Sequence, residues 1–308
     1  MKTSFKNIQH TLLLMLSLTL TSCENVIQLE GVKSESLLVV EAMITNQSGE
    51  QVVKLSKSQN YFDNTTPTNV LNANVQVQDN LGTIYTFKDV KNNGNYVWTP
   101  ASSTQSMGVV GRKYTLKVIA EGETYQATTE LKRVPKIDSV LYQFGEVDQS
   151  QQTKTDIQEG YEPQFYAQDL KGVGDCYLIK SYKNDKILGD VGNFSLAYDA
   201  SFNKGDGADG FQFIASIRRS IAYELFKEKD LLKVELFSIT EDHYNFWVKA
   251  QAQIRNGGLF ATPPAYITTN VFNVNKTSTK KVAGWFATVG LSRFETKIEK
   301  SKARTGLK

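Results

Sequence analysis

Cys23, at the end of the tetrapeptide Leu20-Thr21-Ser22-Cys23, is the residue with the most distinctive chemistry. Lys2 and Lys6 make the start positive, and residues 12–20 form an apolar run too short to span a bilayer, which is typical of a secretory signal peptide. The tetrapeptide itself has the form of a lipobox. It predicts cleavage before the cysteine and attachment of diacylglycerol to its sulfur, usually with an N-linked acyl chain such as palmitate.

An ordinary signal peptide and an uncleaved anchor are the alternatives to a lipobox. An ordinary signal peptide prefers small residues one and three positions before the cleavage site, where Ser22 fits and Leu20 does not. Several acyl chains, at about 0.8 kcal/mol per buried methylene group, make membrane attachment effectively permanent. Glu24, rather than an aspartate, follows the cysteine and favours the outer membrane, on either its periplasmic or its cell-surface side.

A glycine-rich loop over residues 204–210 carries Asp206 and Asp209, whose carboxylates could supply oxygen ligands to calcium. The loop lacks the third acidic position and the distal glutamate of an EF-hand. An ordinary flexible turn is therefore the favoured interpretation, and we expect no metal.

Two loops carry aromatic and proline residues that could contact a ligand or a partner. Such aromatics could stack on a sugar or grip a partner, although aromatics that fold back and fill the base of their own loop are more common. The candidate binding residues are Tyr61, Phe62, Phe260, Pro263 and Pro264.

The sequence selects no catalytic group. Of the two histidines only His243 remains after signal cleavage, which excludes two-histidine catalysis and histidine-rich zinc sites. Cys176 lies in a short apolar run and is expected to be a buried small hydrophobe. No glycine-serine-glycine elbow occurs, and the spacing of the 32 acidic residues selects no carboxylate pair. We therefore expect no enzyme activity, no catalytic residues and no cofactor.

The charge balance bears on possible partners. The 35 Lys and Arg residues nearly balance the 32 Asp and Glu residues, and the signal peptide removes Lys2 and Lys6. A mature chain this close to neutral has no basic stripe to neutralise phosphates, which argues against nucleic acid as a partner.

Short alternating runs after residue 36 predict a mainly β fold. Seven such runs separated by turn residues indicate an immunoglobulin-like β-sandwich, followed by a second β-rich domain that begins after Pro135. The predicted parts are a signal peptide (1–22), a lipidated tether (23–36), the sandwich (37–134), the second domain (135–296) and a loose tail (297–308).

One main helix is predicted in the second domain, at about residues 240–256. Ser238-Ile239-Thr240-Glu241 has the form of a capping box and Gly257-Gly258 closes the end. Strands are expected on either side of it, including residues 211–216 and 283–289. The face expected to pack on the second sheet consists of Tyr244, Trp247, Val248, Gln251 and Ile254.

A family resemblance rests on short motifs spread over the mature chain. These are Val39 to Asn46, Gly108 to Leu116, Ile137-Asp138-Ser139, Phe260 to Pro264 with Asn270, and Gly284-Trp285-Phe286. In this order they resemble Bacteroidetes outer-membrane lipoproteins of unknown function that are often encoded beside TonB-dependent receptors. One departure is Ala42, where such proteins commonly have glycine.

The resemblance implies a non-enzymatic accessory lipoprotein that helps a TonB-dependent β-barrel receptor capture or admit a nutrient. It implies no particular ligand, which could be a small molecule, a glycan or a peptide. Two other functions stay open from the sequence: a secreted hydrolase acting on carbohydrate or peptide, and a structural or adhesive surface lipoprotein.

Replacing Cys23 by alanine tests the predicted anchor. Without the sulfur no thioether to lipid can form, so we expect the variant to lose lipid labelling and to leave the membrane fraction. Cell fractionation with metabolic fatty-acid labelling measures both effects, with Cys176→Ala as the matched control. Unchanged membrane retention, together with an unlabelled parent protein, would contradict the lipobox.

Overall fold

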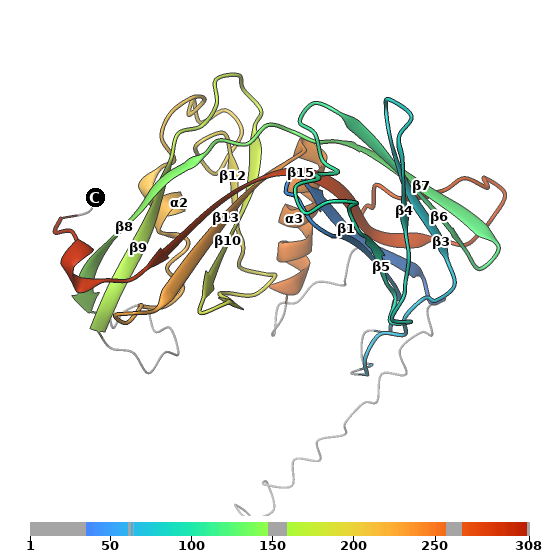
Figure 1. Ribbon diagram of the computed structural model, residues 1–308, viewed down its shortest axis with the longest axis horizontal. Helices are drawn as coiled ribbons and strands as arrows, with labels where there is room; N and C mark the ends of the chain where they lie inside the picture. The colour runs from blue at the N-terminus through green and yellow to red at the C-terminus, as the bar shows by residue number, and fades with distance from the viewer. Residues whose placement is uncertain (1–34, 61–62, 64, 147–158, 257–266, 307–308) are drawn as a thin grey trace, which may run out of the picture. The chain divides into compact units, whose positions relative to one another are not determined.

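The structure is a computed structural model that describes residues 35–60, 63, 65–146, 159–256 and 267–306 (Figure 1). Ser36–Gln59 and Thr65–Lys308 form one compact unit, and most of its regular structure is strand. In the part of the chain that the structure describes, no helix is both long enough and apolar enough to cross a membrane.

Seven strands build the first region in two sheets, which confirms the predicted immunoglobulin-like sandwich. Along β6 the side chains of Tyr114, Leu116 and Val118 are buried while Lys113 and Lys117 are exposed, so one face of the strand points into the core. β1, β2 and β5 lie in one sheet and β3, β4, β6 and β7 in the other. The strands are β1 (Leu38–Thr45), β2 (Gln51–Lys57), β3 (Asn74–Asp79), β4 (Ile84–Phe87), β5 (Asn95–Trp98), β6 (Lys113–Ala120) and β7 (Glu123–Glu130).

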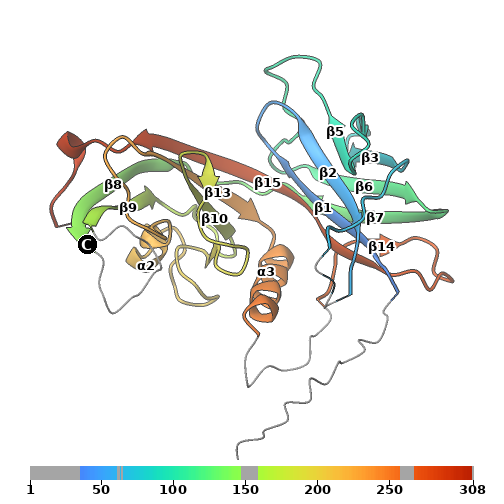
Figure 2. The same ribbon diagram turned by 90° about the horizontal axis from the view of Figure 1, so that it is seen from below.

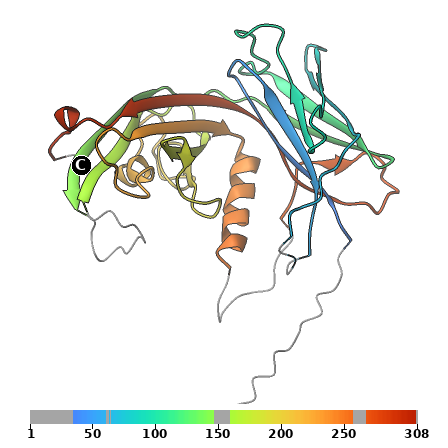
Figure 3. The same ribbon diagram turned by 60° about the horizontal axis from the view of Figure 1, so that its bottom comes forward.

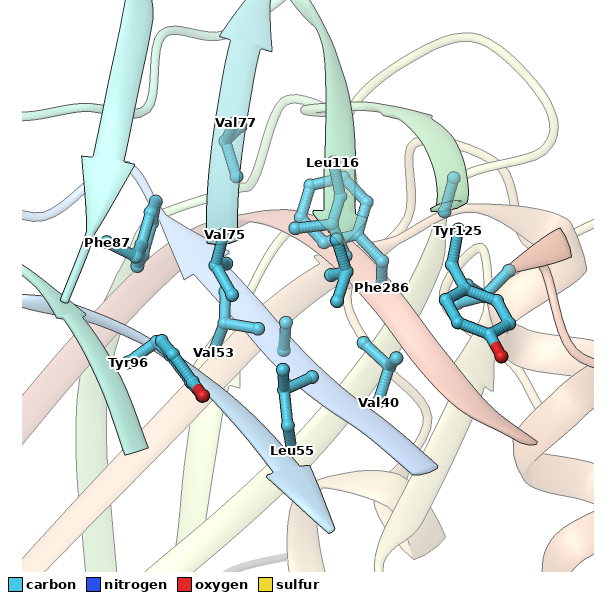
Figure 4. Packing of buried hydrophobic residues seen from close by; sticks show 14 of the residues in the cluster. Val40, Val53, Leu55, Val75, Val77, Phe87, Tyr96, Leu116, Tyr125 and Phe286 are labelled. Carbon is cyan, nitrogen blue, oxygen red and sulfur yellow. The ribbon is translucent and has the colours of Figure 1, made fainter. Parts of the chain in front are cut away.

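The core of this sandwich also takes in residues from the far end of the chain. β15 (Val282–Lys297) lies parallel to β1, and its Phe286 is fully buried between the two sheets (Figure 4). The short strand β14 (Phe272–Asn273) extends the second sheet by pairing with β7. The predicted boundary at residue 134 stays a prediction, but the hydrophobic cluster of residues 38–131 is completed by Val271, Val282 and Phe286.

β15 also continues into the second region, where its other edge pairs antiparallel with β13 (Leu231–Ile239). One sheet therefore runs in the order β11-β10-β13-β15-β1-β2-β5. In Figure 2 the long dark-red strand can be followed from beside β13 to beside β1. The remaining strands are β8 (Ile137–Glu146), β9 (Glu159–Ala167), β10 (Cys176–Lys183), β11 (Lys186–Ile187) and β12 (Ser195–Tyr198).

The second region packs a hydrophobic cluster on each face of the sheet. Tyr177 and Ile179 of β10 join residues of the β8–β9 hairpin and of helix α2 (Ala215–Arg219) in one cluster. Cys176 and Leu178, which point to the opposite face, join Trp247 of helix α3 (Glu241–Ile254) in the other. Figure 3 shows α3 on this second face of the sheet.

The prediction of a strand over residues 211–216 is wrong. Gln212 forms only an isolated bridge with Gln168, and the chain then turns into α2. Phe213, Ile217 and Ile221 are buried at intervals of four residues, which suits a turn of helix against the core better than alternation does.

Helix α3 lies within the predicted span, but its N-cap lies two residues later than the sequence suggests, and the predicted closing pair Gly257-Gly258 lies outside the described residues. Thr240 is the N-cap, and its Oγ1 accepts a hydrogen bond from the backbone N–H of His243 at 3.2 Å. Ser238 belongs to β13 instead. Its hydroxyl donates to the carbonyl of Lys132 and accepts from the N–H of Gly290, both at 2.9 Å, and is therefore committed to the sheet.

The last described residues continue from β15. Ile298 is fully buried, and its N–H donates to the carbonyl of Asp230. A single 3-10 turn, η2 (Lys300–Lys302), follows. The N–H of Arg304 then donates to the carbonyl of Tyr142 at 2.9 Å, so backbone hydrogen bonds attach this segment to β8.

Two glycines with the same φ angle test how closely β15 approaches β1. Gly284 and Gly82 both have φ +92°, but a Cβ on Gly284 would lie 2.0 Å from the carbonyl oxygen of Val40, whereas one on Gly82 would meet nothing within 4 Å. We expect Gly82→Ala to lower the free energy of unfolding by about 1–2 kcal/mol. Gly284→Ala should cost roughly 2 kcal/mol more. Urea unfolding followed by circular dichroism measures both, and equal losses would contradict the tight β1–β15 contact.

Candidate functional site

A groove beside helix α3 is the best candidate site in the described residues. Its volume is about 540 Å³, within the range of small-ligand sites. We call it the α3 groove. Its lining residues are Asp242, Asn245, Phe246 and Lys249 from α3, Thr268, Thr269 and Asn270 from the segment before β14, and Trp285 from β15.

The periodicity of α3 places one stripe of side chains on the sheet and another on the groove. His243 and Gln251 are buried, and the Gln251 amide donates to the carbonyl of Phe194 at 2.7 Å. Asp242, Asn245 and Lys249, three and four residues apart, therefore follow one another along an exposed side of the helix. The prediction that Val248 and Ile254 lie on the packed face is wrong, because these residues are 43% and 55% exposed.

The opposite wall of the groove is held by hydrogen bonds to the edge of β15. The Asn270 amide donates to the carbonyl of Phe286 at 2.7 Å and accepts from its N–H at 3.0 Å. The Thr269 hydroxyl donates to the carbonyl of Gly284 at 2.7 Å. Because β13 pairs with β15 only from Gly290 onward, these side chains satisfy backbone groups that would otherwise lack a strand partner.

The floor of the groove is a stack of aromatic rings. Trp285 lies on the imidazole of His243, with ring centroids 5.3 Å apart and planes inclined by 8°. The Phe246 ring is 4.8 Å from the same indole at 36°. Contacts on two sides restrict the rotamers of Trp285, so the floor is preformed.

Beneath this floor several polar atoms are buried without a hydrogen-bond partner. Among the described residues they include His243 Nδ1, Trp247 Nε1 and Trp285 Nε1. Such groups are uncommon in folded proteins, and each costs stability. Because Trp285 Nε1 is turned away from solvent, the part of the indole that faces the groove is carbon.

The imidazole beneath Trp285 is neutral at physiological pH. Burial, with a smaller contribution from the positive charge of Lys180, lowers the pKa of His243 to about 3. Burial also lowers the pKa of Lys180, whose Nζ lies 5.0 Å from the ring centre of Phe194 and 5.4 Å from that of Phe237. The floor thus rests on a neutral ring.

The polar side of the groove is available for a ligand. Asp242, Asn245 and Lys249 are exposed, and their side chains form no hydrogen bond or ion pair with the described residues. They present in sequence a carboxylate acceptor, an amide that both donates and accepts, and an ammonium donor. This arrangement can bind a polar ligand that has one apolar face.

A second groove, of about 620 Å³, adjoins the first turn of α3 and shares Asp242. It is more strongly charged: Lys204 pairs with Glu241 at 2.8 Å, and Glu130 and Lys132 lie on the other side. Pairs this exposed contribute little to stability.

Three carboxylates elsewhere in the second region could hold a cation. Asp169, Asp199 and Asp209 each bring a ligand oxygen within 4.8 Å of the others. Burial raises the pKa of Asp169. The oxygens already accept hydrogen bonds, from the Tyr177 hydroxyl and the N–H groups of Gly210, Gly174, Asp175 and Gly172.

The two candidate calcium ligands have different surroundings. Asp209 belongs to the carboxylate cluster, whereas Asp206 accepts from the Ser201 hydroxyl at 2.6 Å and from the N–H of Asn203. A calcium site that uses both residues was the disfavoured alternative, and the expectation of no metal there stays a prediction.

Cys176 is buried, as expected from its apolar run. Its side chain is 1% exposed, and burial raises the pKa of the thiol to about 12. A thiol in this environment stays protonated and is a poor nucleophile.

The other site residues predicted from the sequence lie outside the described residues. They are Cys23, Tyr61, Phe62, Phe260, Pro263 and Pro264. Conversely, the sequence did not single out the groove residues Trp285, Phe246, Asp242, Asn245 and Lys249. The available signal was the polar stripe of α3 opposite its packed face, but the facing strand β15 begins 28 residues after the end of α3.

The fold and the groove together define a mainly β protein with an immunoglobulin-like sandwich and a groove with an aromatic floor. A family model for a domain of unknown function (DUF4249) matches residues 24–293, so the chain belongs to this family. Among solved structures, a two fibronectin type-III domain segment from chicken tenascin is similar, with a TM-score of 0.20 and 8% identity over 67% of this chain and 91% of that one. Among curated proteins, none matches the sequence.

The buried His243 should make stability depend on pH. Its pKa is about 3 in the folded protein and about 6.5 in the unfolded chain. As the pH falls from about 6.5 to about 3, the unfolded chain therefore binds a proton at this residue while the folded protein does not. The free energy of unfolding should therefore fall by about 2 kcal/mol between pH 7 and pH 5 on account of this residue. Urea unfolding of the parent and of His243→Phe, which keeps a ring beneath Trp285, measures the difference. Identical pH dependence in the two proteins would contradict the assignment.

Proposed function

We propose that this protein is a lipid-anchored, non-enzymatic outer-membrane protein that captures a ligand in the α3 groove and serves as a partner of a TonB-dependent receptor. The observation that carries the proposal is the pairing of a preformed aromatic floor with a row of exposed side chains that have no partner within the described chain. A groove of this composition suits reversible binding.

The energetics of the groove favour a role in binding over one in stability. Asn245 and Lys249 form no hydrogen bond or ion pair with the described residues that would stabilise the fold, while His243 and Trp285 bury polar atoms without a partner. Buried polar groups without a partner are uncommon in folded proteins and are often found where structure serves function. The α3 groove combines such groups with a row of exposed polar side chains.

The lipobox supports the membrane part of the proposal. Lipid on Cys23 would leave only residues 24–37 between the anchor and the start of β1. At roughly 3.3–3.6 Å per extended residue, that segment reaches a few tens of ångström at most. Ligand captured in the α3 groove would thus stay close to the membrane in which a β-barrel receptor resides.

Affinity purification tests the receptor partnership. The tagged, lipidated protein is purified from a mild detergent extract of its native cells, and bound proteins are identified by mass spectrometry. We expect a large TonB-dependent β-barrel to be recovered in stoichiometric amount. A different lipid-anchored protein with the same tag controls for barrels that adhere nonspecifically, and recovery of the lipoprotein alone would count against the proposal.

A further inference from the structure

We infer that the α3 groove is a saccharide-binding site that takes a neutral sugar of about disaccharide length. The inference rests on the proposed function only in that the groove holds a ligand; it does not require a receptor. It follows from three properties of the described residues: the carbon surface of the floor, the spacing of the polar row that Asp242, Asn245 and Lys249 form, and the balance between the charges of Asp242 and Lys249.

The floor suits the apolar face of a pyranose ring. Trp285 faces the groove with indole carbon because its Nε1 is buried, and Phe246 adds a second ring 4.8 Å away. The axial C–H groups of a sugar carry a slight positive charge and pack against the negative face of an aromatic ring. His243 supports the indole from below at 5.3 Å, so stacking a sugar requires no ordering of the floor.

The polar row suits the hydroxyl groups along the edge of such a sugar. Asp242 and Lys249, with Asn245 between them, are seven residues apart on α3, which is about 10 Å along the helix axis at 1.5 Å per residue. That distance is comparable with the length of a disaccharide. Each hydroxyl both donates and accepts, so it can pair with a carboxylate, an amide or an ammonium group.

The charges argue against other ligand classes. Asp242 and Lys249 offset each other, and a phosphate or other anion would meet the Asp242 carboxylate at the start of α3. A purely apolar ligand would remove Asp242 and Lys249 from water without a partner. A neutral polyhydroxylated ligand leaves no charge unpaired and covers the apolar floor.

The test uses the full mature protein in detergent on an array of neutral oligosaccharides, followed by titration calorimetry with the best binder. We expect saturable binding that is weakened about tenfold by Asn245→Ala and by Asp242→Asn, because each removes one hydrogen-bonding partner of the ligand. Val248→Ala, at an exposed position of the same helix outside the groove lining, is the matched control and should bind as the parent does. Thermal unfolding by circular dichroism checks that all variants are folded.

Two results would overturn the inference: no saturable binding to any neutral saccharide at millimolar concentration, or saccharide binding that neither groove variant weakens. Binding to a peptide library instead, with the same sensitivity to Asn245→Ala, would also overturn it. A protein that brings down a β-barrel receptor but binds no saccharide refutes the ligand class and leaves the proposed function standing. A protein that binds a saccharide but brings down no receptor supports the ligand class and counts against the receptor partnership.

Discussion

The parallel pairing of β1 with β15 is the constraint on which the rest of the structure depends. It holds eight consecutive residue pairs in register, from Leu38 opposite Val282 to Thr45 opposite Val289. The same strand offers its other edge to β13, so one backbone completes the sheet of the sandwich and the sheet of the second region. Since the two paired segments lie more than 240 residues apart, the first sandwich cannot be completed until nearly the whole chain is available, which predicts slow folding for a chain of this size. The absence of a side chain at Gly284, opposite Val40, is what permits this approach.

The α3 groove is a consequence of the different lengths of the strands on the two sides of β15. β13 pairs with β15 as far as Ser238 opposite Gly290, whereas β1 continues along the other edge to Val282. The edge of β15 around Trp285 is therefore left without a neighbouring strand. Helix α3, which begins at once because Thr240 caps it, covers the face next to this edge, and Asn270 occupies the edge itself. Between them Trp285 stays half-exposed.

Local features of the fold could be predicted from the sequence, and pairings between distant segments could not. Alternation in β6 and the helical pattern of α3 depend on neighbouring residues, and both elements lie where the sequence places them. The sequence placed the cap of α3 wrongly because the hydroxyl of Ser238 could either cap the helix or bind within the sheet. It binds within the sheet, to the N–H of Gly290, which is distant in sequence. The groove was missed for the same reason. Its polar stripe is visible in the sequence, but nothing local indicates that β15 would bring an indole to it.

The imidazole beneath Trp285 shows how the groove and the stability of the fold are linked. Burying His243 without a partner for Nδ1 costs about 1–3 kcal/mol relative to a satisfied or apolar ring. A phenylalanine would avoid this cost, whereas the imidazole supports the indole as a ring that lies nearly parallel to it, with planes inclined by 8°. With a pKa of about 3 the ring stays uncharged across mildly acidic surroundings, so neither its position nor that of Trp285 has to change with external pH. Under the proposed function, a floor that holds its shape in this way would lose little entropy when a ligand stacks on it, and that saving would offset part of the cost of the buried histidine.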